Sequence, residues 1–514
     1  MFTALSDYLR LVRAGLVMAR HDVLMPEAYR ARIPLAARAA GACLRLLPGG
    51  GGGGRPGQRL ARALEKLGPA WIKLGQFLAT RPDVIGLAAA SDLSRLKDAL
   101  APFPRSLAIR TLSEAFGEDA ARLFPDISEP VAAASVAQVH RLETPSGPRA
   151  VKILRPDIEA RIETEVRAMK RAAAAAQASR NPEIRRMEPV AFIDTMAKSL
   201  TREMDLRFEA GAASEFADIT AADGYVYAPA VDWERTSQRV LTTEWIEGRS
   251  LTHPGPLSPE ERIDLANRVT RGFLACALDH GFFHADLHEG NMILSTDGRL
   301  FLVDYGIMGR IGMNERMFLA QIIKGFLERD YKGVARVHFE AGYVPAEHSV
   351  DAFAQALRSV GEPIFGKDAA NMSMARLLLQ LFDITRQFGM HLRPELILLQ
   401  KTMVQVEGVA RTIDPSHNIW QAARPVVERW SRREFGPEGL RRLAIDTAGE
   451  AIGRLRRLPE TLDRLEAALA RAAAPPPPPA RPDRPVRTLV LQLGALAAAA
   501  VLGALVWHVL ASRL

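Results

Sequence analysis

The stretch GFFHADLHEGNMIL, residues 281–294, carries five side chains that could do chemistry within a short interval: His284, Asp286, His288, Glu289 and Asn291. The pattern H-x-D-x-H could supply metal ligands. The pattern D-x-x-x-x-N, from Asp286 to Asn291, is the interval of the catalytic loop of kinase-type phosphotransferases. In such a loop the Asp accepts or orients the proton of the attacking hydroxyl, and the Asn binds a metal ion.

A second Asp favours the phosphotransferase interpretation. Phosphoryl transfer needs another carboxylate just downstream, which bridges Mg²⁺ to the phosphates and precedes a glycine. The sequence FLVDYG provides Asp304 in a triplet of the D-F-G form, after a hairpin whose turn is Asp297-Gly298. A metal site of the H-x-D-x-H kind leaves Asn291 and this triplet unexplained. His284 then matches the histidine of H-R-D, which packs against the D-F-G region.

A lysine and an acidic partner should precede the catalytic loop. RAVKIL resembles V-A-I-K and would direct Lys152 from a central strand to the α- and β-phosphates. The acidic partner should lie on a following helix, and EMDLRFEA offers Glu203, Asp205 and Glu209. Asp205 and Glu209 share a helix face, whereas Glu203 lies about 120° away from Glu209. The residues alone leave the choice among the three acids open.

The loop that should cover the phosphates is unusual. A glycine-rich loop lets backbone N–H groups approach phosphates closely, but this chain has VAAAS at Val131–Ser135. Alanine methyl groups restrict the backbone and keep it farther from the phosphates. The Ala-, Arg- and Glu-rich helical region at about residues 157–216 is also long for a protein kinase. Both features argue against an ordinary protein kinase.

The surrounding elements follow the order of a two-lobed phosphotransferase. The six glycines of Gly49–Gly54 form a flexible break after the first helices, and helical patterns then run to about Phe116. Short β-like runs and the helical insert come next, and the chain turns helical again after Gly248, with two short strands near the catalytic loop. The predicted fold class is α+β: a small β-containing lobe with a helical insert, then a large helical lobe, with an N-terminal helical extension and a C-terminal transmembrane helix.

The composition excludes some classes of protein. The chain has 514 residues, a net charge of +8 and a sequence pI of about 9.6. The positive charge is spread along the chain without aromatic interleaving, which argues against a nucleic-acid partner and leaves anionic lipid or phosphate ligands. Cys43 and Cys276 are too few for a disulfide framework or a zinc site, so the sequence indicates a reducing compartment.

The C-terminal segment resembles a membrane anchor. LVLQLGALAAAAVLGALVWHVLA, residues 489–511, contains no acidic or basic residue and is long enough to span a bilayer. A buried soluble helix is the alternative, but the preceding polyproline spacer separates the segment from any globular core. Arg481, Arg484 and Arg487 predict that the catalytic part is cytoplasmic. The high Ala and Arg content indicates a bacterium of GC-rich genome, and hence a single C-terminal anchor in the inner membrane.

The N-terminus, MFTALSDYLRLVRAGLVMARHDVL, lacks the apolar core of a signal peptide. Its apolar residues Leu5, Leu9, Val12 and Leu16 recur at helical spacing. Two interpretations stay open at this point: an amphipathic helix lying on a membrane surface, and an ordinary helix packed on the domain.

Taken together, these motifs resemble the UbiB family, also called ADCK, of atypical kinase-like proteins linked to ubiquinone biosynthesis. The resemblance covers roughly residues 60–460 and rests on seven motifs: KLGQ at Lys73–Gln76, PFP at Pro102–Pro104, AAAS at Ala132–Ser135, VKILRP at Val151–Pro156, E-x-D at Glu203–Asp205 with Glu209 after it, HADLHEGN at His284–Asn291, and DYG at Asp304–Gly306. The family commonly has HADPHPGN, so Leu287 and Glu289 replace two prolines, at positions that bear no ligand in the kinase scheme.

The resemblance implies a role for each motif. Lys152 and Glu209 would form an ion pair, Asp286 would be the catalytic Asp, and Asn291 and Asp304 would ligate Mg²⁺. The residues that it implies around a bound ATP or ADP are Ala132, Ala133, Ala134, Ser135, Ala137 and Lys152, with Glu244, Trp245 and Ile246 beside the adenine.

The K-x-G-Q helix is implied to fold over the place where a peptide substrate would dock. The resemblance assigns a regulatory part to Lys73 and Gln76 with Glu203 and Asp205, with Lys73 reaching toward Glu203. Because this helix would occupy the site of a peptide acceptor, the resemblance argues against protein phosphorylation. The family is associated instead with ATP hydrolysis that supports quinone-modifying enzymes at the membrane. The implied partners are nucleotide, membrane lipids, quinone precursors and other quinone-biosynthesis proteins. The alternatives are a non-catalytic pseudokinase scaffold and a small-molecule or lipid kinase.

The predicted domain organisation follows from these assignments. Its segments are an N-terminal helical extension at 1–125, a small lobe with its insert at 126–248, a large lobe at 249–435, C-terminal helices at 436–474, a Pro-rich linker at 475–488 and a transmembrane helix at 489–511.

Overall fold

The computed structural model describes residues 2–23, 53–79, 85, 87–93, 96, 101–178, 188–365, 380, 384, 387–390 and 394–436. The predicted Pro-rich linker and transmembrane helix lie outside these residues, as do all but the first residue of the predicted C-terminal helices and most of the glycine run. Within the described ranges, no helix is both long enough and apolar enough to cross a bilayer.

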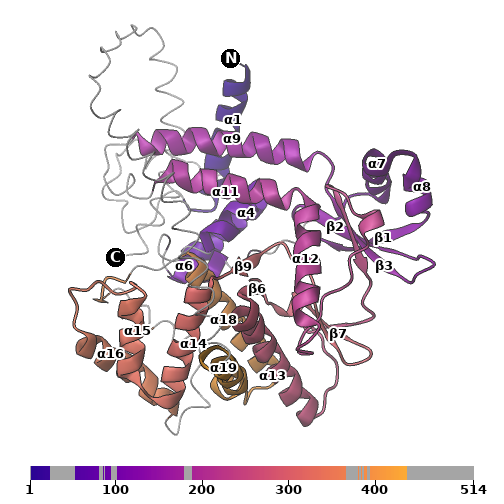
Figure 1. Ribbon diagram of the computed structural model, residues 1–514. Coiled ribbons are helices and arrows are strands. Elements are labelled where there is room, and N and C mark those ends of the chain that lie inside the picture. The colour runs from indigo at the N-terminus through magenta and orange to yellow at the C-terminus, as the bar shows by residue number, and fades with distance from the viewer. Residues whose placement is uncertain are drawn as a thin grey trace, which may run out of the picture.

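A four-stranded antiparallel sheet forms the small lobe (Figure 1). Its strands lie in the order β1 (Ile127–Ala133), β2 (Ala137–Leu142), β3 (Arg149–Leu154) and β4 (Val240–Glu244). Lys152 is paired with Val139 of β2 and Leu241 of β4, which confirms that it lies on a central strand. The β-like run around the alanine loop is therefore two strands joined by a turn.

Two short helices cover one part of this sheet. They are α7 (Arg105–Phe116) and α8 (Ala120–Leu123), separated by a single 3₁₀ turn at Gly117–Asp119. Phe103, Leu112 and Phe124 pack with Val151 and Ile153 of β3 in one core. The last part of the N-terminal extension thus packs directly against the small lobe.

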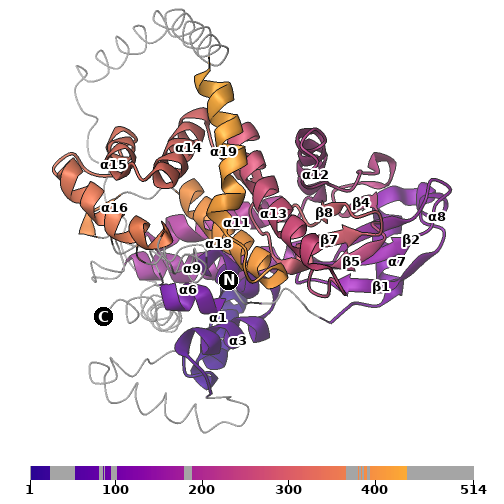
Figure 2. The same cartoon turned by 90° about the horizontal axis from the view of Figure 1, so that it is seen from below.

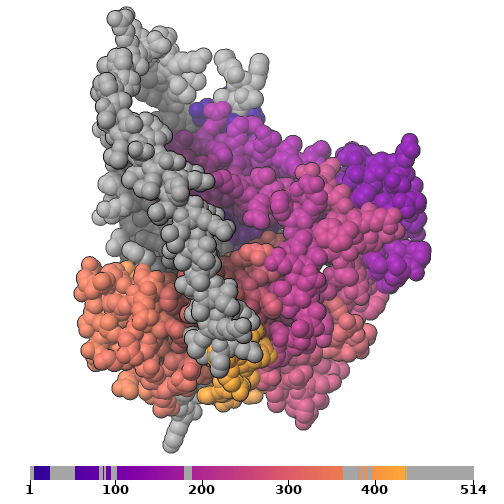
Figure 3. Space-filling model, viewed as in Figure 1, coloured from indigo at the N-terminus to yellow at the C-terminus, as the bar shows by residue number. Residues whose placement is uncertain are grey.

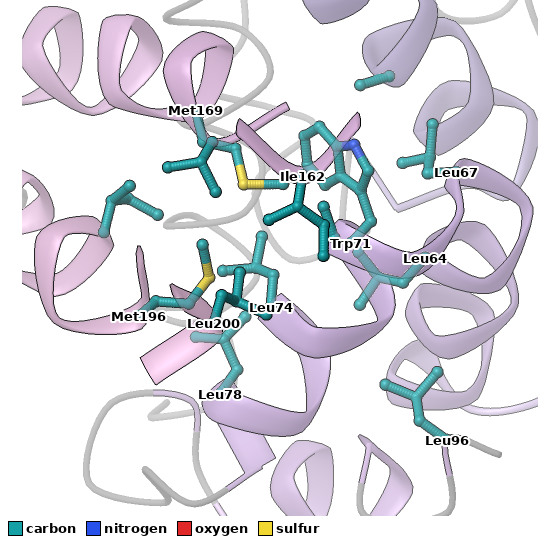
Figure 4. Packing of buried hydrophobic residues seen from close by; sticks show 14 of the residues in the cluster. Leu64, Leu67, Trp71, Leu74, Leu78, Leu96, Ile162, Met169, Met196 and Leu200 are labelled. Atoms are coloured by element: carbon teal, nitrogen blue, oxygen red, sulfur yellow. The ribbon is translucent and has the colours of Figure 1, made fainter. Parts of the chain in front are cut away.

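The N-terminal helices form a separate cluster with the first two helices of the insert. The elements are α1 (Phe2–Arg20), α3 (Pro56–Leu67), α4 (Pro69–Ala79) and α6 (Leu87–Leu93), with α9 (Ile158–Gln177) and α11 (Pro189–Glu203). Figure 4 shows Trp71, Leu74 and Leu78 of α4 at the centre of this core, facing Met169 of α9 and Leu200 of α11. The core fixes α4, which carries the K-x-G-Q element, against the insert.

Close packing explains why the third residue of K-x-G-Q is glycine. A Cβ at Gly75 would collide with the side chains of Leu96 and Leu64. Both contacts are with the ends of leucine side chains, so any larger residue would require those buried side chains to move.

The insert does not continue as one helix through the acidic motif. α11 ends at Glu203, and α12 (Leu206–Thr220) begins after Asp205, which accepts a hydrogen bond from the Arg207 N–H as the N-cap residue. The expectation that Asp205 and Glu209 share the face of one helix is therefore wrong. The side chain of Asp205 competes with the helical backbone and starts a new helix, as N-cap acids do.

The large lobe combines short strands with long helices. The strands are β5 (Gly248–Ser250), β6 (Phe282–His284), β7 (Met292–Ser295), β8 (Leu300–Leu302) and β9 (Met308–Arg310). β7 and β8 form the predicted hairpin, with Gly298 at a φ of 81° in its turn. β6 pairs with β9, and β7 pairs with β8, so the predicted catalytic loop between β6 and β7 has a paired strand at each end.

The helices of this lobe pack around those strands. They are α13 (Pro259–Ala275), α14 (Met313–Glu328), α15 (Tyr331–Glu340), α16 (Val350–Phe365), α18 (Pro394–Ile413) and α19 (Ile419–Phe435). α13 begins with a capping box between Ser258 and Glu261 and ends in a π-helical segment, Cys276–His280, just before β6. Figure 2 shows α18 and α19 beside α13, and Figure 3 shows the small lobe and the α14–α16 region projecting on opposite sides.

The first helix, α1, packs by one face and leaves a second apolar face exposed. Leu11, Ala14 and Met18 are buried in the N-terminal core, and Asp7 is fully buried between Arg167 and Arg171 of α9. The apolar residues singled out in the sequence lie on the outer face: Leu5 is 60% exposed, Leu9 63%, Val12 42% and Leu16 38%. The interpretation of α1 as a helix packed on the domain is therefore confirmed, and the membrane-surface interpretation stays a prediction about its exposed face.

Candidate active site

Lys152 joins the two lobes. Its Nζ donates to both carboxylate oxygens of Glu209 on α12, at 2.7 and 2.9 Å, and to Asp304 Oδ1, at 3.0 Å. α12 itself contacts β4 of the small lobe and the π-helical segment of the large lobe, so it stands between them (Figure 1). The predicted Lys152–Glu209 ion pair is present, and Asp304 adds a second carboxylate to it.

Lys152 and Glu209 are mostly withdrawn from water. Burial by itself would lower the pKa of Lys152, but the charges of Asp304 and Glu209 outweigh it and raise that pKa well above the ordinary value. Burial raises the pKa of Glu209 to about 7, with Lys152 opposing the shift. The charge of Lys152 holds the pKa of Asp304 far below its usual range. Lys152 and Asp304 therefore stay charged at neutral pH, and Glu209 titrates near it.

Asp304 has a backbone conformation that few residues adopt. Its φ is 64°, in the left-handed region, where Asp and Asn are tolerated better than other residues that have a side chain. The side chain of Asp304 is half exposed, although Lys152 binds one of its oxygens. The charge of Lys73 also lowers the pKa of Asp304, so a second cation lies near this carboxylate.

Asn291 is buried and its amide is oriented. Its Nδ2 donates to the backbone carbonyl of Asp286 at 3.1 Å, and the backbone carbonyl of Asn291 accepts from the Val303 N–H at 2.9 Å. This leaves Oδ1 of Asn291 as the atom that can face a cation. One amide oxygen and the carboxylate of Asp304 are the hard oxygen ligands that Mg²⁺ prefers, with phosphate and water completing its shell. The donor set fits the metal that the sequence implies.

His284 has no lone pair left for a metal. Its Nε2 donates to the Val303 carbonyl at 3.2 Å, and its Nδ1 accepts from the Asp286 N–H at 3.2 Å. Burial lowers its pKa, so the ring is neutral, and it packs edge-to-face on Tyr305 of the DYG triplet. Among the described residues, no group of three or more His, Cys, Asp or Glu side chains could hold a metal ion. The packing of His284 against the DYG triplet, which the sequence predicts, is present in the structure.

Asp286 is held by side chains from a distant helix. Its Oδ1 accepts from Nε2 of Gln405 at 3.1 Å and lies 3.8 Å from Nζ of Lys401, both on α18. Its Oδ2 lies 3.7 Å from Nε2 of His288. The sequence analysis did not single out Lys401 or Gln405. Their only local signal is that they lie four residues apart, and so on one helix face, in the mixed stretch ILLQKTMVQVEGV.

The alanine loop is closed by a tight turn and by one arginine. The Ala134 N–H donates to the Ala137 carbonyl at 2.8 Å, while Arg155 donates from Nε and Nη2 to the Ala134 carbonyl at 3.1 and 2.8 Å. Arg155 also stacks over Phe103 of the PFP motif. Arg155 was not predicted to act here, and it ties the loop to two other motifs of the family resemblance.

The remaining predicted loop residues lie on either side of this turn. Ala132 and Ala133 end β1, pairing with Val139 and Gln138 of β2. Ser135 is fully buried, and its hydroxyl has no hydrogen-bond partner among the described residues. Because buried polar groups are normally satisfied, this hydroxyl fits a loop that binds a ligand.

The three acids of the E-x-D region serve three different partners. Glu203 pairs with Lys73 of α4 at 2.9 Å, and both side chains are largely buried. Asp205 binds Arg207, which lowers its pKa, and caps α12. Glu209 alone reaches Lys152. The geometry thus selects one of the three candidates that spacing left open, and the predicted Lys73–Glu203 ion pair is present. Gln76 is half-buried one turn after Lys73.

The segment predicted to lie beside adenine follows β4. Glu244 ends that strand and its N–H donates to the Ala230 carbonyl at 2.8 Å, while Trp245 donates from its backbone to Pro148 at 3.1 Å and lies under Arg141. Ile246 is half-buried in the connection to β5. This segment links the two lobes, as the sequence predicts.

Comparisons with known proteins agree with this geometry. Two family models match: the ABC1 atypical kinase-like domain over residues 95–338 and the UbiB helical domain over residues 357–418. The protein named Probable protein kinase UbiB from Pseudomonas paraeruginosa is 37% identical over 395 residues, which cover 75% of this chain and 74% of that one. Its namesake from Vibrio cholerae is 34% identical over 450 residues, covering 86% and 82%.

A solved structure supports the fold. The Mycobacterium tuberculosis protein Rv3197, determined in complex with erythromycin, superimposes with a TM-score of 0.51 at 22% sequence identity, covering 69% of this chain and 90% of that one. At this identity the likeness concerns the fold alone.

Proposed function

Because the chain belongs to the UbiB family of ABC1 atypical kinase-like proteins, we propose that it binds ATP or ADP with Mg²⁺ and promotes ubiquinone biosynthesis by hydrolysing ATP. The observation that carries the proposal is the bridge made by Lys152. It brings together Glu209 and Asp304, which lie 57 and 152 residues away in the sequence, in the arrangement that kinase-type phosphoryl transfer requires.

Each residue of the site has a part in this proposal. Asn291 and Asp304 would hold Mg²⁺, which when bound neutralises charge on the phosphates. Lys152, kept cationic by its two acidic neighbours, binds phosphate oxygens. Asp286 orients the attacking water and accepts its proton, since Gln405 fixes Oδ1 while Oδ2 has only the exposed His288 nearby, at 3.7 Å.

The acceptor is water or a small or lipid hydroxyl rather than a protein. The relatives carry the name probable protein kinase, so phosphorylation of proteins is the competing proposal. Against it, α4 is fixed beside the site by the Lys73–Glu203 ion pair and by the core around Trp71. A bulky peptide would have to displace that helix before its hydroxyl could reach Asp286.

The proposal is tested in a strain that lacks its own UbiB-family gene. Wild type and Asp304→Asn are expressed at matched levels, and the ubiquinone content is measured by mass spectrometry. We expect ubiquinone to return only with wild type. Equal restoration by both would favour a non-catalytic scaffold, and restoration by neither would contradict a role in this pathway.

The pKa of Glu209 predicts a pH dependence. Because that pKa is raised to about 7, Glu209 is neutral below this pH and the Lys152–Glu209 ion pair forms as the pH rises through it. The ratio kcat/KM, which reports the free enzyme, should therefore increase from pH 6 to pH 8 with an inflection near about 7. Glu209→Gln should remove the inflection as well as lowering the rate. An inflection that persists in Glu209→Gln would assign it to another group.

We also propose that the outer face of α1 lies on the membrane. Leu5, Leu9, Val12 and Leu16 form one exposed stripe, beside exposed Arg13 and Arg20, and each half-exposed side chain would gain about 1 kcal/mol on leaving water. The predicted span at residues 489–511 would hold the chain at the same membrane. Burial of the stripe in anionic lipid would hold the chain at the bilayer, where quinone precursors dissolve.

A polarity-sensitive probe tests this placement without depending on the C-terminal segment. Cysteine is placed at position 9, or at exposed Ile263 of α13 as the control, in a Cys43→Ser, Cys276→Ala background and labelled with a nitrobenzoxadiazole dye. With phosphatidylglycerol vesicles, the dye at position 9 should shift its emission to shorter wavelength and the dye at position 263 should not. An equal response at the two positions would refute the proposal.

A further inference from the structure

The catalytic loop carries no permanent positive charge of its own. Between Asp286 and Asn291 the sequence is D-L-H-E-G-N, which holds two acids and one exposed histidine but neither lysine nor arginine. A phosphate transferred at Asp286 would therefore meet negative charge from the loop. Phosphoryl transfer depends on cations placed around the transferred group. A cation for this end of the site must come from another element.

α18 supplies one. Lys401 lies 3.8 Å from Oδ1 of Asp286, and Gln405, one helical turn later on the same face, donates to the same oxygen at 3.1 Å. The Lys401 side chain is 25% exposed and that of Asp286 is 30% exposed, so the pair lies at the edge of the site and not on the open surface. A distance of 3.8 Å is too long for a hydrogen bond, so the N–H groups of the Lys401 ammonium can still donate to another acceptor.

Packing holds the helix beside the loop. Thr402 is fully buried, and its hydroxyl lies 2.8 Å from the Leu398 carbonyl of its own helix and 3.3 Å from the Ala285 carbonyl of the loop. α18 packs along α13 (Figure 2) and also contacts β9. The position of Lys401 relative to Asp286 is therefore set by buried contacts and does not depend on the weak surface attraction between two charges.

Gln405 also has an unused acceptor. Its Nε2 is engaged with Asp286, but its Oε1 is buried and has no hydrogen-bond partner among the described residues. A buried amide oxygen normally has a partner. A water or hydroxyl seated beside Asp286 would provide one, and that is where the attacking nucleophile of the proposed function must lie.

We propose that α18 completes the active site: Lys401 contacts the γ-phosphate during its transfer, and Gln405 positions the nucleophile together with Asp286. In hydrolysis the water oxygen forms a bond to the γ-phosphorus while its proton passes to Asp286. The bond from that phosphorus to the bridging oxygen breaks, and its electron pair leaves with ADP. Lys401 stabilises the charge on the transferred group. This inference rests on the proposed ATP hydrolysis and places part of its machinery in the UbiB helical domain.

The experiment compares Lys401→Met, Lys401→Arg and Gln405→Met in the full chain, with Lys324→Met on α14 as a control lysine that is half exposed and pairs only weakly with Glu328. ATP turnover is measured together with the affinities for MgADP and for a non-hydrolysable MgATP analogue. We expect wild type to bind the MgATP analogue more tightly than MgADP. Lys401→Met should lower kcat about 100-fold and bind the two nucleotides equally, with the affinity for MgADP unchanged. Lys401→Arg should retain that discrimination. Gln405→Met should lower kcat about 10-fold at unchanged KM.

The outcomes separate this inference from the function on which it rests. If wild type binds both nucleotides and hydrolyses ATP, while Lys401→Met behaves as Lys324→Met does, the inference is overturned and the proposed function stands. A parallel loss of MgADP affinity and of thermal stability in Lys401→Met would show a structural role and overturn it too. If wild type binds neither nucleotide, the proposed function itself fails.

Discussion

Asp304→Asn is expected to lower kcat for ATP hydrolysis by about 1000-fold while the protein remains folded. The substitution removes a carboxylate that would hold Mg²⁺ and that accepts a hydrogen bond from Lys152 at 3.0 Å. It keeps the shape of the side chain, and Asn tolerates the left-handed backbone conformation found at this position. The ratio of the wild-type rate to the variant rate should not change with pH through protonation of Asp304. The pKa of Asp304 lies far below its usual range, so the wild-type group stays ionised over the working pH range.

The control is Asp297→Asn, which neutralises an exposed carboxylate in the turn between β7 and β8. Its rate should stay within about twofold of wild type, as for most surface substitutions away from a site. The measurement is steady-state release of phosphate by purified proteins with the same circular dichroism spectrum. Turnover by Asp304→Asn comparable to that of Asp297→Asn would contradict the proposed metal and phosphate site.

Lys73→Met is expected to destabilise the docking of α4 by about 3 kcal/mol. The side chains of Lys73 and Glu203 are only 12% and 18% exposed, so removing one partner leaves a largely buried charge unpaired. Since this chain contains several cores and need not unfold in one step, the local quantity to measure is hydrogen exchange of the α4 amides. Those amides should exchange about 100-fold faster in Lys73→Met.

Two further variants isolate the charge. Lys73→Met combined with Glu203→Met should restore most of the protection, because a buried ion pair can be replaced by apolar side chains of similar volume at little cost. Lys170→Met breaks the exposed Lys170–Asp194 pair that links α9 and α11, and it should change exchange only slightly. If the double variant exchanges as fast as Lys73→Met, the loss comes from the lysine stem and not from the unpaired acid.

Local motifs were predictable because their geometry is local. The interval from Asp286 to Asn291, the DYG triplet at Asp304 and the hairpin turn before it each depend on a few consecutive residues, and the structure has them as expected. The strand that carries Lys152 is equally local, since its alternating apolar neighbours specify a buried strand. Motif spacing and the family resemblance then put the two lobes in order.

The partner of Lys152 was not decided by spacing. Three acids lie within seven residues, and helical periodicity treats Asp205 and Glu209 as equivalent. The helix break at Asp205 sends Glu203 toward α4 and Glu209 toward β3, and it occurs because Asp205 caps α12 with its own side chain. A capping acid and a helix-surface acid look the same in the sequence until the neighbouring elements are placed.

The sequence by itself determined the chemistry proposed for the site: which lysine, which aspartates and which asparagine we assign to a phosphoryl-transfer centre, because those residues follow one another in fixed intervals along the chain. Only the tertiary structure decided what surrounds them. Arg155 closes the alanine loop, and Lys401 and Gln405 reach Asp286 from more than a hundred residues away. Such contacts arise when helices pack through their apolar faces, and the periodicity of a helix specifies which face is buried but not which distant loop it will meet.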